Sequence, residues 1–179
     1  MRRAVFLDRD GVINRALIRE GKPNAPRVLA EFEILPGVPD ALRQLRESGY
    51  LLIVVTNQPD VPRGRTSRQD VDAIHARLGQ MLPVDDIRVC YHDDDDRCAC
   101  RKPSPGMLYA AAVERDIRLA GSYLVGDRWR DIAAGRRAGC TTILVDSGHD
   151  EPTSVEPEVR LPDLARAAAW ILSRPEDQP

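Results

Sequence analysis

The stretch VFLDRDGVIN, Val5–Asn14, places two aspartates one residue apart at the end of an apolar run. Val5–Leu7 predicts a short buried strand, and Gly11 predicts the turn that ends it. Burial and mutual repulsion both raise the energy of neighbouring carboxylates. A chain that keeps Asp8 and Asp10 at this point therefore needs something that offsets the cost.

Strand-like runs and helix-like periods alternate along the rest of the chain. The run YLLIVV at 50–55 is rich in β-branched residues, which is typical of a parallel strand buried on both faces. Strands are predicted at 4–7, 50–55, 87–90, 123–125 and 142–145. Helices are predicted at 36–49, 67–82, 104–116, 129–138 and 161–172. This alternation predicts a Rossmann-like, three-layer α/β/α fold with a mostly parallel sheet and helices on both faces.

The length of 179 residues suits a single α/β domain, which we place at 1–173, followed by a disordered tail at 174–179. Segment 15–31 has no clear period and is expected to be a loop beside the end of the first strand. Segment 147–160 is acidic and contains proline, so we expect a linker or surface loop there.

The composition excludes several classes of partner. A formal net charge of −2 gives no electrostatic reason to expect nucleic acid or an anionic membrane. The apolar run before Asp8 is too short for a signal peptide, and no later run approaches the length of a membrane span. We therefore expect a soluble, cytoplasmic, monomeric protein whose partner is a small molecule.

Polar residues follow four of the predicted strands, at the edge where ligands of such sheets bind. They are Asp8 and Asp10, then Thr56 and Asn57, then Arg101 and Lys102, then Asp127 and Asp131. Taken alone, each group is as typical of a turn, a helix cap or a surface pair. Their order on successive strand ends instead indicates one site.

Carboxylates gathered at one edge favour a hard cation such as Mg²⁺, with a phosphate oxygen completing its ligands. Asp8, Asp127 and a backbone carbonyl near Asp10 could supply that site. Thr56 and Lys102 would then face the phosphoryl group as hydrogen-bond donor and counter-charge. One aspartate could act as nucleophile, while the other protonates the leaving oxygen and later deprotonates water.

The motifs FLDRDGVIN, TNQ, CRKP and VGDRWRD, in this order, resemble the four motifs of the haloacid dehalogenase (HAD)-like superfamily. Its members are mainly Mg²⁺-dependent phosphotransferases that work through an aspartyl-phosphate, and the similarity covers about 4–145. The resemblance implies a role for each matching residue. Asp8 would be the nucleophile, Asp10 the general acid/base, Thr56 a ligand of the phosphoryl oxygens and Lys102 a support for nucleophile and phosphate. Asp127, with Asp8 and the carbonyl of Asp10, would hold Mg²⁺, supported by Asp131.

A second motif, C-x-H-x5-C-x-C, comprises Cys90, His92, Cys98 and Cys100. Three thiolates and an imidazole form a closed tetrahedral set for structural Zn²⁺, which would brace the loop 90–102. The alternative is three reduced cysteines beside a surface histidine. Asp93–Asp96 could bind a hard cation, although such a run more often forms a solvated loop tip. Cys140 is expected in the core, and His75 is expected to be packed rather than functional.

The cysteine motif followed by RKP resembles the branch that contains heptose 1,7-bisphosphate phosphatases and histidinol-phosphate phosphatases, which have almost no cap domain. In the heptose enzymes, residues around TNQ and RK contact substrate. Here these are Thr56, Asn57, Gln58, Arg101 and Lys102. The resemblance implies hydrolysis of D-glycero-D-manno-heptose 1,7-bisphosphate to the 1-phosphate.

The alternatives are a histidinol-phosphate or other sugar-phosphate phosphatase, and a catalytically silent, zinc-braced binding subunit. The chain departs from the branch in two places. It reads TNQPD where TNQSG is common, and its segment 15–31 is longer. Arg19, Lys22 and Arg27 in that segment could meet a distal phosphate or be solvated.

Overall fold

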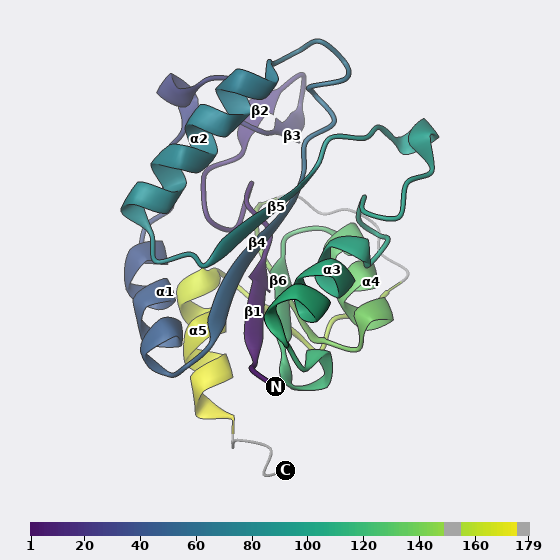
Figure 1. Ribbon diagram of the computed structural model, residues 1–179. Coiled ribbons are helices and arrows are strands. Elements are labelled where there is room, and N and C mark those ends of the chain that lie inside the picture. The colour runs from purple at the N-terminus through teal and green to yellow at the C-terminus, as the bar shows by residue number, and fades with distance from the viewer. Residues whose placement is uncertain (149–154, 175–179) are drawn as a thin grey trace.

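The computed structural model describes residues 1–148 and 155–174 and contains a six-stranded parallel sheet (Figure 1). The strand order is β5-β4-β1-β6-β7-β8. The bounds are β1 (Ala4–Leu7), β4 (Leu51–Asn57), β5 (Asp86–Cys90), β6 (Tyr123–Gly126), β7 (Thr141–Val145) and β8 (Val159–Leu161). Because β1 pairs with both β4 and β6, the two aspartates that follow it lie at the centre of the sheet edge.

Helices cover both faces of the sheet, which confirms the predicted α/β class (Figure 1). One face carries α1 (Val38–Glu47), α2 (Arg68–Met81) and α5 (Leu164–Ser173), and the other carries α3 (Gly106–Arg115) and α4 (Trp129–Ala138). The strand β1 is fully buried between the two layers. Alternate residues of β1 therefore belong to different cores, with Val5 and Leu7 in one and Ala4 and Phe6 in the other.

Local signals explain where the helices begin. The Ser67 hydroxyl accepts a hydrogen bond from the Asp70 amide at the start of α2, as expected of an N-cap. The Asp163 carboxylate caps α5 in the same way, by accepting from the Arg166 amide. The expected helix at 161–172 therefore began too early, because Leu161 is the last residue of β8.

The prediction of a loop at 15–31 is wrong in part. The segment contains an antiparallel hairpin of β2 (Leu17–Arg19) and β3 (Lys22–Asn24), then a 3₁₀ turn, η1 (Leu29–Glu31). Glu20 and Gly21 connect the strands with φ of 53° and 72°. Two left-handed residues match the twist of a two-residue hairpin. Three-residue strands are too short to show an alternating pattern, so no period is visible in the sequence.

The expected linker at 147–160 also contains structure, because its end forms part of β8. This strand extends the sheet beside β7. Residues 149–154 of the linker and 175–179 of the expected tail lie outside the described residues. Cys140 is buried, as predicted. Within the described ranges, no helix has the length and apolar character needed to cross a membrane.

Candidate active site

Three buried carboxylates meet where β1 and β6 end. Asp8 follows β1, Asp127 follows β6, and Asp131 lies in the first turn of α4. One oxygen atom from each lies within 4.8 Å of the other two. The fold therefore brings Asp8 beside two aspartates that lie more than a hundred positions later in the sequence.

This close approach depends on Gly11, in the turn after Asp10. Its φ is +90°, which side chains rarely adopt, and a Cβ atom there would lie 2.3 Å from Oδ2 of Asp127. Any other residue would strain the turn and push the Asp127 carboxylate away from Asp8.

Lys102 neutralises part of this acidic corner. Its Nζ lies 2.7 Å from Oδ1 of Asp8 and 2.6 Å from Oδ1 of Asp131, and it donates to the Val55 carbonyl at 2.8 Å. Burial by itself would lower the pKa of Lys102, but the charges of Asp131 and Asp8 outweigh burial and raise it. The ammonium is therefore held charged inside the protein.

One lysine does not balance three carboxylates. Burial is the main cause that raises the pKa of Asp8 to about 6, partly opposed by Lys102. Burial, then the charges of Asp8 and Asp131, raise the pKa of Asp127 well above its usual range. Neither Asp127 oxygen has a hydrogen bond of good geometry among the described residues, and nearby Ser147 is the weakest influence on its pKa. Buried, unpartnered carboxylate oxygens fit a hard divalent cation.

Asp10 is held by a different set of contacts. Its carboxylate accepts hydrogen bonds from Asn14 at 3.0 Å and from Gln58 at 2.9 Å. It also accepts three from the guanidinium of Arg9, at 3.0 to 3.1 Å. Arg9 is fully buried, whereas part of Asp10 faces the cavity described below.

The residues that end β4 support this arrangement. Gln58 donates to the Thr56 hydroxyl at 3.0 Å as well as to Asp10. Gln58 and Thr56 are both buried. The Asn57 side chain donates to the Lys102 carbonyl at 3.0 Å and accepts from the Lys102 amide at 3.1 Å. The side chains of Asn57 and Gln58, which the sequence predicted as substrate ligands, contact protein groups, and both residues also line the cavity described below.

Arg101 is anchored at the cavity wall. Its Nε donates to Asp94 at 2.9 Å and its NH1 donates to the His92 carbonyl at 3.2 Å. The same Asp94 oxygen accepts from Arg130 at 2.8 Å, and Asp93 pairs with Arg63. Asp94, Asp95 and Asp96 are exposed, as expected of a solvated loop tip, but the first two aspartates of the run, Asp93 and Asp94, also bind arginines.

A cavity of about 570 Å³ opens over Asp8 and Asp10. Six cationic side chains line it besides Lys102: Lys22, Arg63, Arg65, Arg101, Arg128 and Arg130. Lys22 comes from the hairpin, which Arg128 ties to α4 by donating to the Pro23 carbonyl at 3.1 Å. Arg19 does not line the cavity and pairs with Glu31, while Arg27 lies near Asp60. Five aspartates also line the cavity, so its seven cations exceed its anions by two, and this excess of positive charge suits an anionic ligand.

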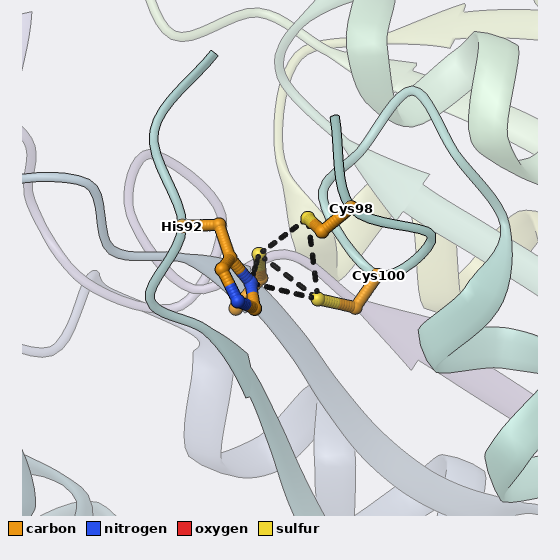
Figure 2. A group of neighbouring side chains, drawn as sticks. His92, Cys98 and Cys100 are labelled. Carbon is orange, nitrogen blue, oxygen red and sulfur yellow. Dashed lines mark hydrogen bonds between the residues drawn. The ribbon is translucent and has the colours of Figure 1, made fainter. Parts of the chain in front are cut away.

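The predicted zinc ligands also lie together. Figure 2 shows the His92 ring and the sulfur atoms of Cys98 and Cys100 pointing toward one another. The sulfur of Cys100 lies 3.2 Å from that of Cys90 and 3.5 Å from that of Cys98, and the sulfurs of Cys90 and Cys98 are 3.7 Å apart. Nδ1 of His92 lies 3.3 and 3.5 Å from the sulfurs of Cys100 and Cys90. A tetrahedral site with Zn–S bonds of 2.3 Å has edges of roughly 3.8 Å, so the geometry fits zinc.

Sequence reasoning missed Arg9, Asn14, His75 and Asp94. Arg9 and Asn14 lie inside the first motif, but no short-range signal shows that their side chains turn toward Asp10. Nε2 of His75 accepts a hydrogen bond at 2.8 Å from NH1 of Arg9, a contact across 66 positions. A histidine on an otherwise apolar helix face was the available signal in the sequence, and the structure shows His75 half-buried.

Comparisons with known proteins agree with this geometry. A HAD-hydrolase-like family model matches residues 99–167. The D-glycero-beta-D-manno-heptose-1,7-bisphosphate 7-phosphatase of Pseudomonas putida is 37% identical over 177 residues, covering 94% of this chain and 98% of that protein. The enzyme of the same name from Escherichia coli is 34% identical over 189 residues, covering 98% and 91%.

A solved structure shares the whole architecture. The D,D-heptose 1,7-bisphosphate phosphatase from Bordetella bronchiseptica, complexed with magnesium and phosphate, has a TM-score of 0.81 and 34% identity. The match covers 95% of this chain and 98% of that one. The chain therefore belongs to the HAD-like hydrolase family. Within that family it is a phosphatase, which excludes the alternative of a catalytically silent binding subunit.

Proposed function

We propose that the protein hydrolyses a small sugar phosphate through a phosphorylated Asp8. The Asp8 carboxylate attacks phosphorus, and the bond from phosphorus to the sugar oxygen breaks while Asp10 gives that oxygen a proton. Asp10 then takes a proton from a water molecule that attacks the aspartyl-phosphate, which releases phosphate and restores Asp8. The observation that carries this proposal is the Lys102 contact with Asp8, at 2.7 Å, beside a cationic cavity.

The remaining residues of the site position the phosphoryl group. Thr56 donates its hydroxyl proton to a phosphoryl oxygen, and Lys102 stabilises the charge shared by nucleophile and phosphate. Asp8, Asp127 and the backbone carbonyl of Asp10 would hold Mg²⁺, which supplies positive charge for the phosphoryl oxygens. The buried, unpartnered oxygens of Asp127 support that assignment.

Asn57 and Gln58 hold Lys102 and Asp10 in place and, because both also line the cavity, bind the substrate there. Arg101 faces the cavity from its anchor on Asp94 and binds a second phosphate or the sugar hydroxyls.

The favoured substrate is D-glycero-D-manno-heptose 1,7-bisphosphate, losing its 7-phosphate. The relatives that carry this name support it, as does a cavity with more cations than one phosphate needs. We further propose that residues 1–173 act as one catalytic domain, monomeric and cytoplasmic. A site assembled from a single chain and four unpaired cysteines support this.

The substrate can be tested by measuring phosphate release from both anomers of the bisphosphate, histidinol phosphate and fructose 1,6-bisphosphate. We expect kcat/KM for the heptose bisphosphate to exceed that for histidinol phosphate by at least about tenfold, since a paired second phosphate is worth about 1.5–3 kcal/mol. We expect it also to exceed that for fructose 1,6-bisphosphate, which has two phosphates and therefore tests recognition of the sugar. Phosphorus NMR of the product should show the 1-phosphate retained. Equal or faster turnover of histidinol phosphate would transfer the assignment to that ester.

We also propose that Cys90, His92, Cys98 and Cys100 bind one structural zinc. Elemental analysis of the purified protein should find about one zinc per chain. The Cys98→Ser variant should lose it, melt at a lower temperature and lose activity, because the freed loop carries Arg101 and Lys102. The matched control is Cys140→Ser, outside the cluster, which should keep its zinc. A zinc-free parent enzyme with full activity would contradict the bracing role.

A further inference from the structure

Arg9 is a buried cation with no role in the reaction proposed above. Its side chain is 0% exposed and lies between Asp8 and Asp10 in the sequence. Two of its nitrogen atoms, Nε and NH2, donate to the Asp10 carboxylate. The third, NH1, lies 2.8 Å from Nε2 of His75 on α2. The guanidinium therefore has Asp10 on one side and His75 on the other, and each of its three nitrogen atoms has a hydrogen-bond partner.

The contact with His75 fixes the state of its ring. A guanidinium only donates hydrogen bonds, so Nε2 must accept, and the neutral ring carries its proton on Nδ1. Burial, then the charge of Arg9, lower the pKa of His75 to about 4, which agrees with a neutral ring. An apolar side chain at position 75 would leave NH1 of a buried cation without an acceptor.

The contact with Asp10 fixes the carboxylate in turn. A guanidinium that meets a carboxylate with two nitrogens holds its plane as well as its position. Asn14 and Gln58 approach the same group with neutral amides. Arg9 thus contacts the Asp10 carboxylate through two nitrogen atoms and fixes the direction in which it points.

We propose that His75 and Arg9 are positioning residues for Asp10: the imidazole orients the guanidinium, which aims the carboxylate at the water that hydrolyses the aspartyl-phosphate. The proposal rests on the proposed function, in which Asp10 is the base of that step. It extends the site to α2 and replaces the sequence-based interpretation of His75 as a merely packed residue.

The two half-reactions separate this role from general damage to the fold. With p-nitrophenyl phosphate, the leaving nitrophenolate needs no proton, so attack by Asp8 does not depend on the aim of Asp10. Dephosphorylation still depends on the orientation of Asp10, because Asp10 takes the proton from water. In the His75→Leu variant we expect the dephosphorylation rate constant to fall about tenfold, a part of the 10²–10⁴ that general acid–base catalysis supplies. The phosphorylation rate constant should stay within about twofold.

Both rate constants follow from one experiment on each variant. At saturating p-nitrophenyl phosphate, kcat is measured together with the fraction of protein that intact-mass spectrometry finds phosphorylated after an acid quench. Dividing kcat by the phosphorylated fraction gives the rate constant of dephosphorylation. Dividing kcat by the unphosphorylated fraction gives the rate constant of phosphorylation. The His75→Gln variant keeps an acceptor for NH1 and should stay within about threefold of the parent. Arg77→Gln, on the exposed side of α2, is the control for changes to the helix.

The inference is supported if His75→Leu raises the phosphorylated fraction and lowers KM together with kcat, while His75→Gln restores both. It is overturned if the two rate constants fall together, if neither changes, or if His75→Gln behaves like His75→Leu. A parent enzyme that turns over without any phosphorylated protein, and without need of Asp8, would instead overturn the proposed function.

Discussion

The Asp8→Asn variant is expected to lose at least about 10³-fold in kcat on any phosphate ester, because an amide cannot form the bond to phosphorus. No phosphorylated protein should be trapped on acid quenching. Unlike most changes in a buried polar site, this one should not lower stability. It removes a carboxylate whose pKa burial raises to about 6, so that its charge is unfavourable in the folded protein at neutral pH.

Phosphate release, intact mass and thermal melting of Asp8→Asn and the parent check these expectations. A melting temperature equal to or above that of the parent, with activity lost, would separate chemistry from folding. Retention of more than about a hundredth of the parent activity would mean that another group attacks phosphorus.

The Lys102→Met variant should lose both activity and stability. Methionine has a similar length but leaves Asp8 and Asp131 buried without their cation. Removing one partner of a buried ion pair costs about 3–5 kcal/mol, so the free energy of unfolding should fall by that amount at neutral pH. We expect kcat to fall at least about 10²-fold, because the charge on nucleophile and phosphate is no longer offset.

Denaturant unfolding and phosphate release measure these two effects. The stability control is Lys22→Met, at the only other lysine in the sequence, since Lys22 is exposed on the hairpin and has no ion pair with any residue that the structure describes. An unchanged free energy of unfolding for Lys102→Met would show that the buried contacts contribute little to the folded state.

The sequence predicted the sheet because most of its strands are apolar runs of four or more residues, separated by helices of regular period. It failed at β2, β3 and β8, each three residues long, where pairing across a turn or beside β7 decides the structure. No local pattern could reveal such pairing.

The same limit applies to the site. Strand ends predicted that Asp8, Lys102 and Asp127 would meet, because topology alone brings them together. The contacts of Arg9 with His75, and of Asp94 with two arginines, depend on side-chain directions between distant elements. Residues of the first kind are predictable from order along the chain, whereas residues of the second kind require coordinates.

Lys102 is attached to β4 at both ends. Its main chain exchanges two hydrogen bonds with Asn57, and its ammonium donates to the Val55 carbonyl two residues earlier. A mobile lysine side chain would lose rotational freedom each time it contacted a reacting phosphoryl group. Here that entropy is lost once, during folding, so every catalytic cycle begins with a preorganised ammonium.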